Sequence, residues 1–387
     1  MSTSSTALQH SFTPASILAT GIALPPPVDS VRFMELDQEM RARHGQSREI
    51  RESLNKFVSN SKIAVRHSIN PCWQHEDQKM TEVEDIFTPY DFDPPAHLRA
   101  KFWHQHAPRL ALQAAKAALA NWKGSVKDIT HVVTTSTTGW SEPGIAVDLI
   151  EQLGLPEDTR KIEININGCF CGASCIRTAR DIIRGGEAGA VLVVAVELAS
   201  VQYNITETDI SSLVSSSLFS DGAGAVILGQ GGDWSFDYSG MSLVPNTKHL
   251  LSLTPEFERE SNAVKMFLHP EVAKSLATYF REARGRGLLD DFLRGQAIPP
   301  ALAVHPGGPN ILEAMNNVFA ERGWPQDCLT SSYKTLRETG NLGSAAVLFV
   351  LHNLLNQTTA DDVAYLAFGP GVTVEWGRLS RNKNMAA

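Results

Sequence analysis

Cysteine is scarce in this sequence: five residues among 387, spread unevenly along the chain. A small, odd number of cysteines does not suggest a disulfide framework, so a reducing compartment fits better. Basic residues are also outnumbered, since 34 Lys and Arg stand against 42 Asp and Glu, for a net charge of -8. This balance argues against a nucleic acid or an anionic membrane surface as the main partner.

Long apolar runs are missing as well. No stretch reaches the roughly 18 consecutive apolar residues of a membrane-spanning helix. The beginning, MSTSSTALQHSF, has neither the basic region nor the apolar core of a signal peptide. We therefore expect a soluble, cytoplasmic protein with a flexible N-terminus over residues 1–15. With 43% hydrophobic residues, the rest of the chain can bury a large core.

One stretch, residues 161–183, places a cysteine between a strand pattern and a helix pattern. Isoleucines alternate with polar residues up to position 166, and apolar residues recur at helical spacing from position 176. We predict a strand over 162–166, a turn at Asn167-Gly168 and a helix that begins near Cys169. Because unpaired N–H groups at a helix N-terminus favour negative charge, we expect Cys169 to ionise well below a pKa of about 8.5. Cys169 is thus a candidate nucleophile, and a packing role in the core is the alternative.

Cys171 and Cys175 follow in the same stretch and spell C-x-C-x3-C with Cys169. Within a helix, positions 171 and 175 share one face while 169 points elsewhere, and no His or acidic ligand is close in sequence. We interpret the pair as core residues and predict no metal site.

Strand and helix patterns alternate along most of the chain. The predicted strands are 16–24, 129–136, 162–166, 190–196, 221–229, 234–244 and 301–304, and the predicted helices are 32–58, 110–122, 270–280, a segment containing 311–319, and 345–355. Residues 71–100 show neither period and are expected to form a long ordered loop. Alternating units in two comparable parts, 16–232 and 233–387, favour an α/β fold built by internal duplication, with sites at the carboxyl ends of strands.

Two further polar residues stand where a predicted strand or loop gives way to a helix. His305 opens His-Pro-Gly-Gly-Pro, and Asn341 lies in Gly-Asn-Leu-Gly before the last helix. An imidazole can hold a thiolate as an ion pair, and both groups can donate to a developing oxyanion. The alternatives are an ordinary turn histidine and an asparagine that caps a helix.

Taken together, these motifs resemble the type III polyketide synthases, the family of chalcone and stilbene synthases. The resemblance runs from ILATGIALPPP through GCFCG, SLFSDGAGA, HPGGP and GNLGSAAVLFVL to FGPG at 368–371. It implies a thiolase fold, in which two duplicated βα halves form a five-layered αβαβα core. It also implies a homodimer whose active sites are reached by a coenzyme A tunnel.

The resemblance assigns a role to each motif. Cys169 would accept a starter acyl group from an acyl coenzyme A. His305 and Asn341 would bind the thioester carbonyl of malonyl coenzyme A and stabilise the enolate that decarboxylation leaves. The enolate would then attack the Cys169 thioester. No metal or redox cofactor is implied, because coenzyme A thioesters are the only small molecules that this reaction needs.

The family's pocket positions can also be carried over to this chain. Phe219 matches an aromatic gatekeeper, and the second gatekeeper falls on Met266. Positions that line the plant cavity read Ala199, Gln202, Ser215 and Gly343, so a chalcone product is doubtful, and Glu142 replaces a Met that reaches across the plant dimer. Candidates for binding coenzyme A are Lys56, Arg66, Gly308 and Asn310, where Lys56 and Arg66 would meet its phosphates.

Three functions remain open on the sequence alone. The favoured one is a microbial type III polyketide synthase that releases a pyrone or a resorcinol. A condensing enzyme like ketoacyl synthase III, which uses an acyl carrier protein, has the same Cys, His and Asn but usually continues its His motif with Gln-Ala-Asn. A catalytically silent subunit that only binds acyl chains is the third.

Overall fold

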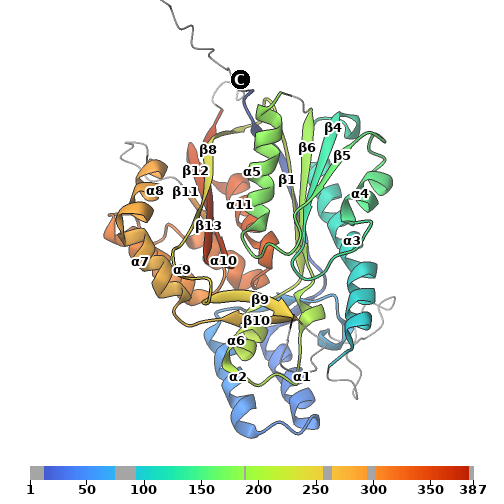
Figure 1. Cartoon of the computed structure of the whole chain (residues 1–387), viewed down its shortest axis with the longest axis vertical. Coiled ribbons are helices and arrows are strands. Elements are labelled where there is room, and N and C mark those ends of the chain that lie inside the picture. The colour runs from blue at the N-terminus through green and yellow to red at the C-terminus, as the bar shows by residue number, and fades with distance from the viewer. Residues whose placement is uncertain (1–12, 75–92, 187–188, 256–263, 294–300, 383–387) are drawn as a thin grey trace, which may run out of the picture.

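The computed structural model describes residues 13–74, 93–186, 189–255, 264–293 and 301–382, and Figure 1 shows their arrangement. Within these residues, nine strands form one sheet in the order β11-β12-β13-β8-β1-β7-β6-β4-β5. The strands are β1 (Ser16–Ala23), β4 (Ile129–Thr135), β5 (Arg160–Glu163), β6 (Ala190–Glu197), β7 (Gly222–Gly229), β8 (Trp234–Leu243), β11 (Ala301–Val304), β12 (Asp362–Gly369) and β13 (Thr373–Arg381).

Helices pack on both faces of this sheet and between its two arms. They are α1 (Ser30–Arg43), α2 (Arg48–Asn60), α3 (Ala96–Ala120), α4 (Ile145–Leu153), α5 (Cys171–Arg184), α6 (Ile210–Leu218), α7 (Val272–Arg281), α8 (Ala283–Leu293), α9 (Pro309–Glu321), α10 (Thr330–Thr339) and α11 (Ala346–Gln357). Two small antiparallel pairs, β2 (Pro27–Asp29) with β3 (Val65–His67) and β9 (Leu251–Pro255) with β10 (Val264–Leu268), lie apart from the large sheet. None of the described helices is long and apolar enough to cross a membrane.

The sheet repeats one pattern on either side of its centre. In the N-terminal arm β4 and β6 are parallel, while β7 runs antiparallel to both β6 and β1. In the C-terminal arm β11 and β12 are parallel, while β13 runs antiparallel to both β12 and β8. The arms meet where β1 pairs with β8, at Ile17 and Trp234. The predicted duplication is therefore visible in the strand order.

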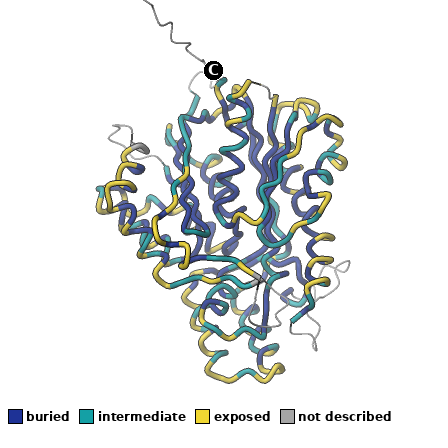
Figure 2. The backbone as a smooth tube through the Cα atoms, in the orientation of Figure 1, coloured by how far each residue is buried: buried dark blue, intermediate teal, exposed yellow. Residues whose placement is uncertain are grey.

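Five layers follow from the two arms (Figure 1): α3 and α4, the first arm, α5 with α11, the second arm, and α7 to α9. Alternate residues of β6 explain this layering. Val191 and Val193 pack in the cluster of α5 and α11, whereas Leu192 and Val194 pack against α3. All eight residues of β6 are buried, as a strand covered on both faces requires. Figure 2 shows the buried backbone concentrated in the central layers. The thiolase fold is confirmed.

Several predicted boundaries are wrong. The helix expected over 32–58 is two helices, because Gly45, at a φ of 81°, follows the end of α1 and Ser47 caps α2 through its side chain. The long loop expected over 71–100 gives way to helix α3 at Ala96, after Pro95 at its N-cap. Residues 75–92 of that loop lie outside the described residues, as do residues 1–12 of the predicted flexible N-terminus. Ala15 is already fixed, since it is buried and its carbonyl accepts a hydrogen bond from the Phe236 N–H.

Candidate active site

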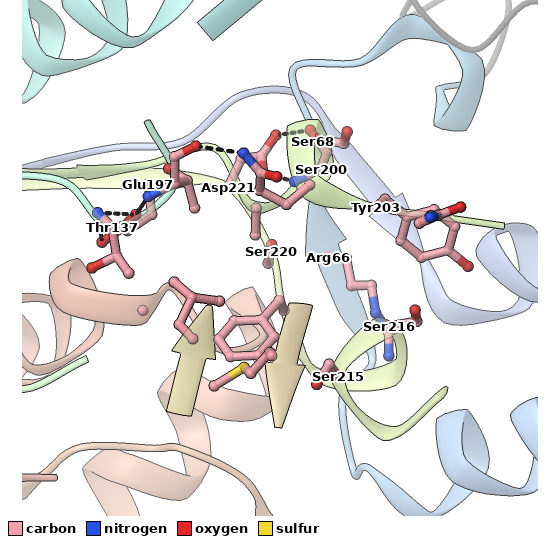
Figure 3. Close-up of a pocket in the computed structure, with 18 of the residues that line it drawn as sticks. Arg66, Ser68, Thr137, Glu197, Ser200, Tyr203, Ser215, Ser216, Ser220 and Asp221 are labelled. Carbon is pink, nitrogen blue, oxygen red and sulfur yellow. Dashed lines mark hydrogen bonds between the residues drawn. The ribbon is translucent and has the colours of Figure 1, made fainter. Parts of the chain in front are cut away.

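A chamber lies where these motifs meet the small sheets. Its wall is built from β3, α6, the β9–β10 pair, the turn before α5 and the segment after β6. Most of the predicted pocket residues line it: Cys169, Phe219, Met266, Ala199, Gln202, Ser215, Gly343 and Arg66. Figure 3 shows ten of the wall residues labelled, with Glu197 at one side of the view and Arg66 at the other. Segments far apart in sequence thus form a single cavity.

Cys169 stands in a turn between β5 and α5. The preceding Gly168 has a φ of 86°, and an added Cβ there would lie 2.2 Å from the Pro370 ring, so the turn favours glycine on both grounds. The strand ends at Glu163 and the helix begins at Cys171, so Cys169 precedes the first helical residue by two positions. The expected strand over 162–166 is too long, because Ile166 has a left-handed φ of 57°.

The predicted low pKa of Cys169 is wrong. Burial and the charge of Glu197 raise the pKa of this thiol to about 12. Burial penalises the thiolate more than nearby donors stabilise it, and Glu197 adds like-charge repulsion. At neutral pH the Cys169 side chain is therefore a neutral thiol.

Asn341 precedes the central helix α11 and is held in place by hydrogen bonds to four backbone groups. Its side-chain nitrogen donates to the Gly307 carbonyl at 3.1 Å, and its side-chain oxygen accepts from the Gly343 N–H at 3.0 Å. Its backbone N–H donates to Leu218 at 2.9 Å, and its carbonyl accepts from the Ser220 N–H at 3.0 Å. Four hydrogen bonds leave one amide hydrogen of the side chain for a ligand.

His305 follows β11 and is 2% exposed. Its backbone N–H donates to the Leu366 carbonyl of β12 at 2.7 Å, and its Nδ1 has no hydrogen-bond partner in the described structure. Burial lowers the pKa of this imidazole to about 4. At neutral pH the ring is uncharged, so it can accept one proton and donate one hydrogen bond.

The carboxyl end of β12 connects the three residues. His305 bonds to Leu366, while an added Cβ at Gly369, three residues on, would lie 3.2 Å from the Cys169 backbone nitrogen. Three residues of strand span roughly 10 Å. Asn341 is tied to the His305 loop through Gly307. Neither His305 nor Asn341 lines the chamber itself, whereas Phe219 and Gly343, which both contact Asn341, do.

The predicted coenzyme A residues lie in different surroundings. Lys56 is exposed on α2, which packs against the chamber helix α6, and Asn310 is exposed at the start of α9, after Gly308. Their roles stay predictions. Arg66 is 3% exposed, with its guanidinium inside the chamber wall. This position does not favour contact with the phosphates of coenzyme A.

Two buried acids of the wall were missed from the sequence. Glu197 accepts hydrogen bonds from the N–H groups of Thr137 and Thr138 at 3.0 Å and from the Ser344 hydroxyl, and burial raises its pKa. Asp221 accepts from the Ser200 hydroxyl at 2.6 Å, and burial raises its pKa to about 6. The signal was present for Glu197, because it is the one charged residue that directly ends the apolar run 190–196.

Comparison with known proteins finds family models that match the N-terminal and the C-terminal part of the chain. The family model of chalcone and stilbene synthases, N-terminal domain, matches residues 2–232, and the corresponding C-terminal domain matches 300–380. Bisdemethoxycurcumin synthase of Oryza sativa subsp. japonica is 28% identical over 383 residues, covering 93% of this chain and 91% of that protein.

Two solved structures share the fold of this chain. PKS-I from the brown alga Ectocarpus siliculosus superposes with a TM-score of 0.83 at 23% identity, over 96% of this chain and 99% of that one. The C-terminal type III polyketide synthase domain of "Steely1" from Dictyostelium superposes with a TM-score of 0.81 at 25% identity, over 95% and 99% of the two chains.

Proposed function

The chain belongs to the chalcone and stilbene synthase family and is a type III polyketide synthase, and from this premise we propose which of its residues carry the reaction. Enzymes of this family join acyl groups from coenzyme A thioesters by forming carbon–carbon bonds. We assign acyl loading to Cys169 and malonyl decarboxylation to His305 with Asn341. The observation that supports the assignment is that Cys169 and Gly343 line one chamber, and that the Gly343 N–H donates to the Asn341 side chain.

Loading begins from a neutral thiol and a neutral imidazole. As the Cys169 sulfur attacks the acyl carbonyl, its proton passes to His305, which is able to accept it because burial keeps the ring uncharged. The bond between the carbonyl carbon and the coenzyme A sulfur breaks, and the leaving sulfur takes the proton. A covalent thioester on Cys169 replaces one difficult condensation by two easier steps.

Decarboxylation then uses the fixed donors. The free amide hydrogen of Asn341 and the N–H of His305 would both point at the thioester oxygen of malonyl coenzyme A. When carbon dioxide leaves, the electron pair of the broken bond moves onto that oxygen as an enolate. Because the amide is held in place before the reaction, little reorganisation is needed as the charge develops. The enolate carbon attacks the thioester carbonyl on Cys169, and the bond from that carbonyl carbon to the Cys169 sulfur breaks. The chain, longer by two carbons, is left on coenzyme A, and the Cys169 thiolate takes up a proton.

Phe219 and Met266 would act as gatekeepers, since both side chains are partly buried and both line the chamber. Met266 is fixed through its carbonyl, which accepts from the Ser211 hydroxyl at 3.2 Å. Gln202 and Ser215 would shape the space for the growing chain, and Lys56, Gly308 and Asn310 would meet coenzyme A. We propose a pyrone or resorcinol product, no added cofactor, and a cytoplasmic homodimer.

The proposal is tested by incubating the protein with acyl coenzyme A starters and malonyl coenzyme A. We expect the intact protein to gain the mass of one acyl group, and we expect pyrones or resorcinols in the product mixture by mass spectrometry. Release of labelled carbon dioxide from malonyl coenzyme A separates an enzyme from a silent acyl-binding subunit. Loading only from an acyl carrier protein, and never from coenzyme A, would refute the proposal.

A further inference from the structure

Arg66 is a buried positive charge that pairs with no carboxylate among the residues that the structure describes. It is 3% exposed on β3, donates to the Ser30 hydroxyl at 2.7 Å and to the Ser217 carbonyl, and lies 4.6 Å above the Phe33 ring. No carboxylate pairs with it in the described part of the chain, and its Nε has no hydrogen-bond partner there. Burial lowers its pKa only to about 10, so it remains a cation at neutral pH.

The other charged groups of the chamber wall already have partners. Glu197 is bound by backbone N–H groups and Ser344, and Asp221 by Ser200 and the Ile69 N–H. Lys265 pairs with Asp209 at 3.2 Å and with Glu207 at 3.7 Å. Among the described residues of this wall, Arg66 is therefore the charged side chain whose counter-ion would have to come from a ligand. A buried ion without a counter-ion is costly, and an anion supplied by a ligand would offset that cost.

The position of Arg66 fixes which part of a ligand it meets. In Figure 3, Arg66, Tyr203 and Ser216 lie at one side of the chamber, and Glu197 and Thr137 lie at the other. Cys169 belongs to the Glu197 side, because Ser344, which donates to Glu197, packs against Gly172 in the first turn of the helix that Cys169 precedes. An acyl group attached to Cys169 would thus extend through the chamber with its far end toward Arg66.

Three aromatic side chains stand near Arg66 in the chamber wall. Phe33, Trp73 and Tyr203 form a trio with ring centroids 5.0 to 6.0 Å apart, and all three line the chamber. Tyr203 is occupied, because its hydroxyl donates to Asp37. The Ser216 hydroxyl is the neighbouring polar group that could add a second hydrogen bond. This end therefore suits an apolar chain that finishes in one anionic group.

From this arrangement, and resting on the proposed loading of Cys169, we propose that Arg66 selects acyl starters that carry a carboxylate at the end remote from the thioester. The carboxylate would accept a charge-assisted hydrogen bond from the guanidinium, and the methylene chain would lie along the aromatic trio. The preferred substrates would be monothioesters of dicarboxylic acids with coenzyme A. Arg66 would then determine specificity and would take no part in bond making.

Matched pairs of starters test this proposal in the unaltered enzyme. Succinyl, adipyl and suberyl coenzyme A are compared with butyryl, hexanoyl and octanoyl coenzyme A, which have the same chain lengths but end in a methyl group. We expect kcat/KM for loading to be about tenfold or more higher for the dicarboxylic member at the fitting length. A ratio at or below one at every length would overturn the proposal.

Variants then assign the preference to the side chain. Arg66→Met should bring the ratio to about one or lower while the methyl-ended starter still loads, and Arg66→Lys should keep part of the preference. Lys265→Met is the matched control, since it removes a paired cation from the same chamber and should leave the ratio unchanged. An equal loss for both starters in Arg66→Met and Arg66→Lys would show that Arg66 only supports the fold.

The same assay distinguishes this proposal from the one on which it rests. If no starter of either kind acylates Cys169, the proposed loading step fails. If methyl-ended starters acylate Cys169 and dicarboxylic ones do not, loading stands and the role of Arg66 is wrong.

Discussion

The two arms of the sheet place different residues at equivalent positions. In the N-terminal arm the central helix α5 lies between β5 and the buried strand β6, and Cys169 precedes it. In the C-terminal arm the central helix α11 precedes the corresponding strand β12, and Asn341 precedes that helix. A glycine with a left-handed φ comes directly before each: Gly168 at 86° and Gly340 at 73°. The same backbone device therefore presents both side chains.

What differs is how tightly each side chain is held. Asn341 has four hydrogen bonds to surrounding backbone groups, two from its side chain and two from its main chain. Cys169 lines an open chamber. Under the proposed assignment, the repeated fold thus places the nucleophile against a chamber in one arm and a fixed donor in the other. A donor works best when it is already aimed.

The largest effect should come from removing the thiol of Cys169. Cys169→Ala takes away the sulfur that forms the thioester, so covalent acylation should fall below detection, a loss of about 1,000-fold or more. Intact-protein mass spectrometry after incubation with acyl coenzyme A measures it. Cys328→Ala, at a partly buried cysteine outside the chamber wall, is the control and should load normally. An alanine variant at 169 that still gains the acyl mass would remove the contrast between the arms.

Removing the side chain of Asn341 should spare acyl loading of Cys169 and slow the decarboxylation of malonyl coenzyme A. Asn341→Ala deletes one donor to the enolate oxygen, which is worth roughly 100- to 1,000-fold in rate. Release of labelled carbon dioxide from malonyl coenzyme A should fall by that factor, while the mass gain at Cys169 persists. His305→Ala should lower both, because it also removes the proton acceptor for loading. If Asn341→Ala reduced loading as strongly as decarboxylation, the two arms would not have separate tasks.

The protonation states of Cys169 and His305 predict how the reactivity of the thiol depends on pH. With the pKa of Cys169 near 12 and that of His305 near 4, the resting site holds a thiol and a neutral imidazole between these values. Alkylation by iodoacetamide requires the thiolate, whose fraction rises tenfold per pH unit below the pKa. The rate at Cys169, corrected with Cys169→Ala, should therefore climb steadily from pH 6 to pH 10. A plateau near pH 7 would instead reveal a thiolate and imidazolium ion pair.

The sequence predicted the elements of this comparison better than their electrostatics. Strand and helix periods place Cys169, His305 and Asn341 at the ends of elements because local patterning survives in the fold. The pKa of Cys169 could not be predicted in this way, since it depends on burial by Gly369 and Pro370 and on the charge of Glu197, which come from distant parts of the chain. For the same reason, the sequence led us to expect Arg66 at the phosphates of coenzyme A, whereas the structure places it inside the chamber wall.

Boundaries failed where one residue changes the backbone. Ile166 carries a β-branched side chain in an alternating run, so propensity alone extends the strand through it, whereas its left-handed φ belongs to the turn that presents Cys169. The Ile166 side chain is exposed, and its backbone N–H donates to the Ser136 carbonyl at 2.9 Å, so a backbone contact accompanies a conformation that costs local strain. It is the kind of site where local preference and function disagree.

The smallest expected effect concerns the two glycines. An alanine at either position adopts a left-handed φ, which costs about 1 to 2 kcal/mol. At Gly168 the new Cβ would also lie 2.2 Å from the Pro370 Cδ, and at Gly340 it would lie 2.9 Å from the Ser220 Cβ. Gly154→Ala is the matched control, because Gly154 has a φ of 63° and no atom within 4 Å of an added Cβ. It reports the strain of a left-handed backbone at an uncrowded site, and Gly340, with a ψ of -169°, has a conformation that favours glycine more strongly still.

We expect the midpoint of urea denaturation to fall in the order Gly154→Ala, Gly340→Ala, Gly168→Ala, with about 1 to 3 kcal/mol of overpacking added at the crowded sites. Gly168→Ala should also slow acyl loading, since the Pro370 ring cannot yield without moving the turn that holds Cys169. Gly340→Ala should slow decarboxylation instead, because Ser220 and Leu218 clamp Asn341. Equal midpoints for all three variants would mean that the close packing at Gly168 and Gly340 relaxes freely. The two turns would then not be what fixes the nucleophile in one arm and the donor in the other.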